Sequence, residues 1–364
     1  MQQLDMLVNR LPAPTWNRLK LNHKLIKNLQ VAGSCQPVVG LQGPVCLKQA
    51  EEGCCHGPET TCGVHSRVEK MATGMGQELD QVEMGGKLRL VASEGVSRAT
   101  ITCKYLDGQQ TADQIEIIAK DGAEITVIMT YISTASAQGT SLIRTKVLAG
   151  AGAKVNLVQV QLLGKGFRHL NDVGAELAED ADFDILQLQL GGAEIYNGVR
   201  TELVGRTSNF DAAIGYFGRS GQKLDMNFIA NHYGKQTTCT MTADGVLQEK
   251  AEKTYRGTID FKTGSSGSQG DEKETVLLLS DDVINQTVPL ILCSEEDVKG
   301  NHGANIGRLD EELLFYLCSR GFSEREAVDM MAKAKIEALA RNIDDEETQK
   351  LVDMYLEGVI TDAD

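Results

Sequence analysis

The stretch from residue 122 to residue 190 decides the fold, because it repeats one pattern three times: GAEITVIMTYI (122–132), GAKVNLVQVQLL (152–163) and DADFDILQLQL (180–190). In each copy a small turn residue and an alanine precede a charged residue and a strand of alternating apolar and polar residues. The alanines Ala123, Ala153 and Ala181 recur at near-equal intervals of about 30 residues, a spacing typical of solenoid rungs. A fourth copy begins at Ala193, one strand and one turn after the third.

This repeat predicts a mainly β protein whose core is a right-handed parallel β-helix. In such a solenoid each rung stacks aliphatic side chains inward and places small residues at its corners. Alternating strands run from about residue 85 to residue 293, and no strong helical segment separates them, which disfavours a doubly wound α/β sheet. An antiparallel sandwich or jelly roll stays open as an alternative, because strand pairing cannot be deduced from one sequence.

The N-terminal region differs from this core. Residues 1–30 carry an amphipathic helical pattern that Pro12 and Pro14 interrupt. Residues 31–66 are rich in Gly, Pro and Cys and have no sustained period. We therefore expect a separate region over residues 1–84 that is helical at its start and rich in Cys, Gly and Pro after it.

The C-terminal region is predicted to be helical from about residue 309. Gly321 can end one helix in the left-handed conformation, and Ser323 with Glu326 forms a capping box that begins the next. The expected organisation is thus a β-helix core over residues 85–308 and a helical module over residues 309–364.

Charge and composition exclude several classes of function. The chain has 36 lysines and arginines against 51 aspartates and glutamates, a net charge of −15, which argues against nucleic acid as a partner. No stretch is apolar enough to span a membrane, and the first thirty residues lack the apolar core of a secretory signal. We therefore expect a cytoplasmic protein whose nine cysteines are reduced thiols.

A cluster of cysteines and histidines in the N-terminal region has the ligand types that bind zinc or iron. It lacks the Cys-x-x-Cys spacing that pre-forms half of such a site, and adjacent cysteines rarely bind one ion together. A segment with reactive thiols is the favoured interpretation, and a metal site is the alternative. The residues are Cys46, Cys54, Cys55, His56, Cys62 and His65.

A β-helix is also a common scaffold for carbohydrate-active enzymes, which need converging carboxylates and aromatic platforms. Asp180, Asp182 and Asp184 alternate along one strand and could project together. The chain has one tryptophan, so solvated acidic residues are the better interpretation. No Gly-x-x-x-x-Gly-Lys-Ser/Thr sequence is present, so the chain has no P-loop of its own.

The stretch LILCSEEDVKGNHGANIGRLDEELLFYLCSRGFSEREA (290–327) resembles the C-terminal signature of the SufB/SufD family, the β-helical subunits of the SUF iron–sulfur cluster assembly machine. The similarity rests on the His-Gly-Ala turn at His302, on GRLDEE (307–312), on FYL (315–317) and on the SRG and SEREA runs that follow. It extends over roughly residues 85–340 and leaves the Cys-rich segment unmatched.

The resemblance implies a non-catalytic scaffold that pairs through its C-terminal β-helix strands with a SufB-type subunit or with a second copy of itself. It also implies that the helical module docks SufC, an ABC-type ATPase. SufB proteins carry a cluster-linked cysteine where this chain has Glu274, so the chain is more similar to SufD. A solenoid that binds an unrelated protein, or the carbohydrate enzyme above, stays open as an alternative.

Two sets of site residues follow from this resemblance. His302 and Cys293 are candidate ligands of a transient iron–sulfur cluster, since imidazole and thiolate both bind iron and a partner chain can complete the set. The candidate SufC-docking residues are the apolar side chains of the helical module: Leu313, Leu314, Phe315 and Met330.

Overall fold

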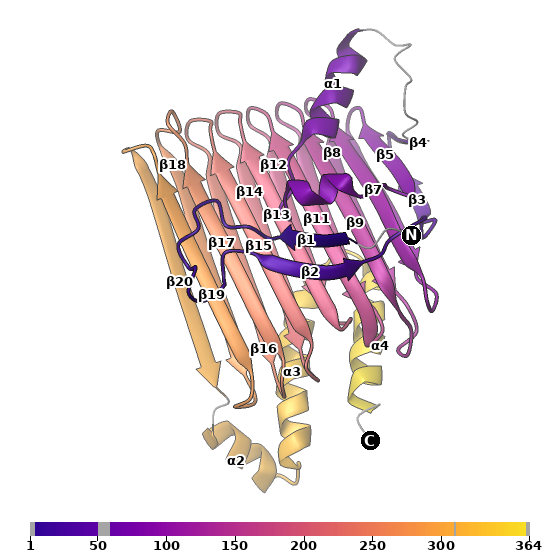
Figure 1. Ribbon diagram of the computed structural model, residues 1–364, viewed down its shortest axis with the longest axis vertical. Helices are drawn as coiled ribbons and strands as arrows, with labels where there is room; N and C mark the ends of the chain where they lie inside the picture. Colours follow the sequence, from indigo (N-terminus) through magenta and orange to yellow (C-terminus); the bar gives the residue numbers. More distant parts are fainter. Residues whose placement is uncertain (1–3, 50–58, 309–310, 362–364) are drawn as a thin grey trace.

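The computed structural model describes residues 4–49, 59–308 and 311–361. Within these ranges, two nine-stranded sheets face each other across one long interior, and a two-stranded sheet lies outside them. Figure 1 shows the strands of both sheets side by side, from β3 and β4 near the N-terminal end to β19 and β20 at the other.

The two long sheets are called sheet 1 and sheet 2. In hydrogen-bonded order, the strands of sheet 1 are β20 (Val298–Arg308), β18 (Ser268–Leu278), β16 (Thr238–Leu247), β14 (Asn209–Gly218), β12 (Asp182–Gln189), β10 (Lys154–Leu162), β8 (Glu124–Ile132), β6 (Val96–Lys104) and β3 (Val38–Gln42). Those of sheet 2 are β19 (Ile284–Cys293), β17 (Glu252–Phe261), β15 (Lys223–His232), β13 (Glu194–Leu203), β11 (Gly166–Leu177), β9 (Gln138–Ala149), β7 (Gln110–Ala119), β5 (Gly86–Ala92) and β4 (Val45–Gln49).

The repeat in the sequence marks successive rungs, as predicted. Lys154 on β10 pairs in parallel with Glu124 on β8 and with Asp182 on β12, so the copies of the pattern stack directly. The alanines before them, Ala123, Ala153 and Ala181, are fully buried at the corners. The chain passes from one sheet to the other at each turn, which makes it a parallel β-solenoid and excludes the antiparallel sandwich.

Alternation along each strand fills the interior. Odd-numbered residues of β10 and β12 point inward, and the same column continues through Phe183 and Phe210, whose rings stack 5.6 Å apart. Most of the side chains in this interior are aliphatic. Burying such a side chain stabilises the fold by about 1.5–3 kcal/mol.

The middle rungs carry a buried stack of amides that the sequence did not predict. Gln159 accepts hydrogen bonds from Asn171 at 2.8 Å and from Gln187 at 2.7 Å, and Gln187 accepts one from Asn197 at 2.7 Å. Gln159 also donates to the hydroxyl of Tyr131 at 3.0 Å. These bonds link neighbouring strands and rungs and so help to fix their register, although the amide oxygens of Asn171 and Asn197 have no hydrogen-bond partner.

The amphipathic helix predicted within residues 1–30 was wrong. These residues contain β1 (Leu4–Val8) and β2 (Lys24–Leu29), an antiparallel pair on the outer face of sheet 2. The first helix of the described residues is α1 (Glu59–Lys70), and the 3-10 helix η1 (Gln77–Gln81) follows it. The buried side chains Met6, Val8 and Ile26 pack on strands β7 to β13. Tertiary packing on the sheet therefore overrides the local helical period.

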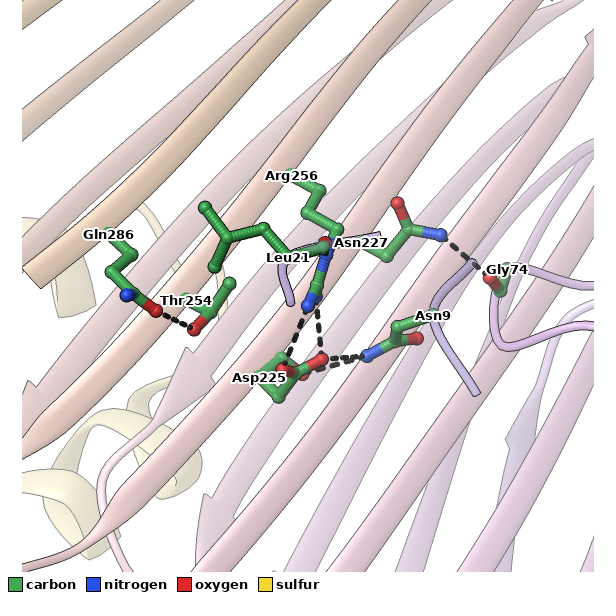
Figure 2. A network of polar contacts seen from close by, with 8 residues as sticks. All are labelled: Asn9, Leu21, Gly74, Asp225, Asn227, Thr254, Arg256 and Gln286. Carbon is green, nitrogen blue, oxygen red and sulfur yellow. Dashed lines mark hydrogen bonds and ion pairs between the residues drawn. The ribbon is translucent and has the colours of Figure 1, made fainter. Parts of the chain in front are cut away.

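A buried polar network holds this N-terminal segment on sheet 2 (Figure 2). The guanidinium of Arg256 pairs with Asp225 through bonds of 2.7 and 3.2 Å and donates to the carbonyl of Leu21 at 2.6 Å. Asn9 donates to Asp225 at 2.8 Å, and Asn227 donates to the carbonyl of Gly74 at 3.0 Å. Segments that are far apart in the chain are thus joined by charge-assisted hydrogen bonds.

The C-terminal helices are α2 (Glu311–Ser319), α3 (Glu324–Ala340) and α4 (Glu346–Thr361). Helices α3 and α4 pack on the outer face of sheet 1 through Ile336, Val352 and Leu356. The predicted capping box of Ser323 and Glu326 begins α3. Gly321 has the predicted positive φ of 100°. Each helix in the ranges described above is too short or too polar to cross a bilayer.

Candidate functional site at the uncapped end of the solenoid

The two ends of the solenoid differ. At the N-terminal end, β3 and β4 pair antiparallel with β6 and β5 and so close the first rung. At the other end, β19 and β20 are the outermost strands of their sheets in the described chain, and β20 is exposed along nearly its whole length (Figure 1). An edge strand with free backbone donors and acceptors is a template for pairing with another chain.

His302 lies on β20, on the interior face of this end. It pairs in register with Glu272 on β18, whose side chain is buried inside the solenoid, so the two side chains share one face of sheet 1. Asn301, one residue earlier, instead bonds to Asp271 on the outside at 2.8 Å. His302 is exposed because no further rung covers it.

Glu272 is a site residue that the sequence analysis missed. Its side chain is buried, with 4% of the residue exposed, and one of its carboxylate oxygens has no hydrogen-bond partner. The carboxylate occupies the space beside Gly257 on β17, where a larger residue would place its Cβ. Burial, with the neighbouring Glu274 adding to it, raises the pKa of Glu272 to about 7. Gly270, Glu272 and Glu274 alternate with outward-facing residues, so the sequence indicates that Glu272 points inward. Adding the rung length of about 30 residues to Glu272 leads to His302, and this spacing could have identified the pair.

Glu274 is held in a buried ion pair with Lys253. Tyr216 donates to this carboxylate at 3.1 Å, and Lys253 donates to the hydroxyl of Thr287 at 3.1 Å. Burial lowers the pKa of Lys253. The carboxylate of Glu274 is therefore bound by partners within this chain, whereas Glu272 is the inward-facing carboxylate in register with His302.

The structure does not bring Cys293 beside His302. Cys293 is the last residue of β19 and is in register with Phe261 on β17. The residue of β19 level with Glu272 is Pro289, because Pro289 is in register with Gly257, which contacts the Glu272 carboxylate. Cys293 thus lies four residues farther along the strand, about 13 Å at roughly 3.3 Å per residue. It is exposed at the same open end.

This arrangement offers one imidazole and one carboxylate at the end of the interior. Both are suitable donors to iron. No group of three or more His, Cys, Asp or Glu side chains with metal-binding geometry occurs in the portion of the chain that is described. Two donors do not complete a site, so further ligands would have to come from outside the described residues.

The predicted docking residues lie on or beside α2, which packs on α3 and has no buried residue. Phe315 is 76% exposed, while Leu313 and Met330 are also exposed and Leu314 is half-buried. The exposed Tyr316 and Phe322 extend the same apolar surface and were not predicted. We call these six residues the α2 surface.

The structure describes only part of the Cys/His cluster. Cys46 is exposed on β4. Cys62 and His65 lie on α1, where only their backbone is described. The remaining candidates, Cys54, Cys55 and His56, lie outside the described residues.

The aspartates considered for a carbohydrate site do not converge on a cleft. Asp182 and Asp184 lie on the outer face of sheet 1, where burial and the neighbouring Asp211 and Asp182 raise the pKa of Asp184 to about 6. Asp180 sits in the preceding turn and accepts a bond from Thr207. The one tryptophan, Trp16, belongs to the segment that crosses the other sheet.

Comparison with known proteins agrees with the geometry. The family described as "SUF system FeS cluster assembly, SufBD core domain" matches residues 102–335. The iron–sulfur cluster assembly protein SufD of Bacillus subtilis is 27% identical over 217 residues, 59% of this chain and 50% of that protein. SufB of the same organism is 27% identical over 143 residues, 38% of this chain and 31% of that protein.

A SufBD family protein of Mycobacterium leprae is 29% identical over 147 residues, 40% of this chain and 17% of that protein. The matched segments therefore span half or less of the length of these relatives.

Proposed function

Because the chain belongs to the SufBD family of the SUF iron–sulfur cluster assembly system, we propose that it is a non-catalytic, cytoplasmic scaffold subunit of a SUF complex. It pairs at the uncapped end of the solenoid with a SufB-type subunit or a second copy of itself, and it docks a SufC-type ATPase. The observation that carries the proposal is that the two ends of the solenoid differ: antiparallel strands close the N-terminal end, and no strand covers the edges of β19 and β20 at the other end of the described chain.

Pairing at the open end is supported by what the last rung exposes. The outer edges of β19 and β20 have no strand partner within the described chain, and Ile306, on the interior face, is 52% exposed. A partner that adds strands there satisfies the backbone groups and covers the end of the apolar interior, much as each rung covers the one before it.

Docking of the ATPase is supported by the α2 surface. Helices α3 and α4 bury their apolar side chains on sheet 1, so they already have a structural role. Helix α2 has no buried residue, and its apolar side chains Leu313, Phe315 and Tyr316 are exposed, with the guanidinium of Arg320 5.1 Å from the Tyr316 ring. Exposed aromatic and aliphatic anchors of this kind mark protein interfaces.

The docking is tested by co-purification with the SufC-type ATPase of the same organism. Phe315→Asp should abolish co-purification, because it places a charge on the α2 surface. Met354→Asp is the matched control, since Met354 is 68% exposed on α4, away from α2. Equal retention of the ATPase by both variants would exclude the α2 surface as the docking site.

A transient cluster is proposed at the interface, as cargo and not as a resident cofactor. His302 would supply a neutral imidazole and Glu272 a carboxylate oxygen, and the partner subunit would supply the remaining ligands. The orphaned buried oxygen of Glu272 supports this, because an unsatisfied buried carboxylate is costly unless something outside the chain binds it.

The cluster proposal is tested on the complex with SufB-type and SufC-type subunits, purified without oxygen. His302→Ala should lower iron and sulfide per complex while assembly is retained. Asn305→Ala is the control, because Asn305 is exposed on the same strand but on its outer face. Unchanged iron in His302→Ala would assign the histidine a structural role.

A further inference from the structure

A basic pocket lies between the N-terminal segment and the outer face of sheet 2, away from the uncapped end. Its volume is about 620 Å³, within the usual range for small-molecule sites. Residues of the loop before β2, β2 itself and the starts of β11, β13 and β15 line it. The charged groups are Lys20, Lys24, Lys27, Arg168, Lys223 and Glu194.

The charge of this pocket opposes that of the whole molecule. Five cations and one carboxylate line it, in a chain whose net charge is −15. The carboxylate of Glu194 is matched by Arg168, which donates to it at 2.7 Å. The four lysines have no carboxylate partner among the described residues; Lys24 is half-buried, and Lys20, Lys27 and Lys223 are exposed.

The loop before β2, which carries Lys20, is held in place. The side chain of Asn22 accepts from the backbone of Trp16 at 2.9 Å and donates to Asn17 at 2.6 Å. The carbonyl of Leu21 accepts from the buried Arg256. Lys20 has a φ of 56°, the left-handed region that favours Gly or Asn, so a lysine is kept there at a conformational cost.

Two larger pockets hold fewer unpaired cations. The pocket of about 1180 Å³ beside η1 contains four carboxylates against three cations, and Arg144 in it already pairs with Asp80 and Asp172. The pocket of about 820 Å³ beneath α1 is also basic, but Arg67 pairs with Glu176 and Arg89 with Glu116, which leaves Lys48 and Lys120 without an ion pair among the described residues. The basic pocket beside β2 has four such lysines, the most of these three pockets.

We propose that this pocket binds a small ligand that contains two or three linked phosphates. Each terminal phosphate carries about −1.5 to −2 charges at neutral pH, so a chain of phosphates matches four ammonium groups better than a single phosphate. The lysines approach from two sides, Lys24 from β2 and Lys223 from the start of β15. His23, also in the lining and exposed, provides a ring for a nucleoside portion.

The site is independent of cluster assembly in this proposal, and it is tested on the full chain alone. Trp16, the single tryptophan, directly precedes the pocket residue Asn17 and reports binding by its fluorescence. We expect saturable binding of inorganic triphosphate that weakens at high ionic strength, and clearly weaker binding of orthophosphate. Equal affinity for a nucleoside triphosphate supports recognition of the phosphates alone, and a higher affinity supports a nucleotide.

The variant Lys24→Ala/Lys223→Ala should weaken triphosphate binding at least about tenfold, because charge-assisted hydrogen bonds are the strong contacts in such a site. The matched control is Lys104→Ala/Lys250→Ala, which removes the same charge from exposed lysines outside the pocket. The proposal is overturned if triphosphate does not bind saturably, if orthophosphate binds equally well, or if both double variants bind alike.

Discussion

The ion pair of Arg256 and Asp225 should be the main support of the N-terminal segment, and Asp225→Ala tests this. Arg256 is 1% exposed and Asp225 3%, and the pair makes two hydrogen bonds, of 2.7 and 3.2 Å. Removing the carboxylate leaves the guanidinium buried with the carbonyl of Leu21 as its partner. Breaking a buried pair in this way costs about 3–5 kcal/mol.

The assay is urea unfolding followed by two signals. Fluorescence of Trp16 reports the N-terminal segment, because Trp16 bonds to Asn22 beside Leu21, and far-ultraviolet circular dichroism reports the solenoid. In Asp225→Ala the fluorescence transition should move to lower urea and should precede the loss of β structure, since the segment detaches before the sheets unfold.

Two further variants make the test decisive. Thr254→Ala on the same face removes one hydrogen bond to Gln286 and should cost only about 0.5–1.5 kcal/mol. The double variant Asp225→Leu/Arg256→Met should be more stable than the sum of its single changes predicts. A loss below about 1 kcal/mol in Asp225→Ala would refute the reasoning, because an unpaired buried guanidinium costs more than that.

Two other predictions concern the uncapped end and the interior. The pKa of Glu272 rises from 4.5 to about 7 on folding, so its contribution to the free energy of unfolding is fully present below pH 4.5 and is lost as the pH rises through about 7. This pH-dependent contribution is on the order of 3 kcal/mol. Glu272→Gln should lack it in thermal or urea unfolding of the isolated chain. A Cβ added at Gly245 on β16 would lie 1.9 Å from the buried ring of Tyr216 on β14. Gly245→Ala should therefore lower the free energy of unfolding by about 1–3 kcal/mol in the same assay. An unchanged stability would contradict the close packing of Gly245 against Tyr216.

The solenoid could be predicted because its signal is repeated. Three successive rungs repeat a corner alanine and an alternating strand, so Ala123, Ala153 and Ala181 predicted the fold class, and the structure then showed that these copies stack in register. The capping box at Ser323 was predictable for a similar reason, since its two residues interact within one helical turn.

The N-terminal segment could not be predicted in the same way. Its lysines and leucines fit a helical period, but its conformation depends on Arg256 and Asp225, which lie far along the chain from it. Glu272 was missed because the alternation along β18 shows only that its side chain points inward, and the register of β18 with β20 is needed to place it beside His302. Four residues of the α2 surface were named from the family resemblance and from their apolar character, whereas Tyr316 and Phe322 were recognised only from their exposure in the structure.

Hydrogen exchange of β20 tests the central claim, that the uncapped end is the pairing surface of a SUF scaffold. The measurement compares backbone amides of Val298–Arg308 in the isolated chain and in the complex with its SufB-type partner. The account predicts that amides on the free edge of β20 exchange fast in isolation and become protected in the complex, while β3 and β4 at the capped end do not change. Unchanged exchange in β20, with protection appearing elsewhere, would contradict it.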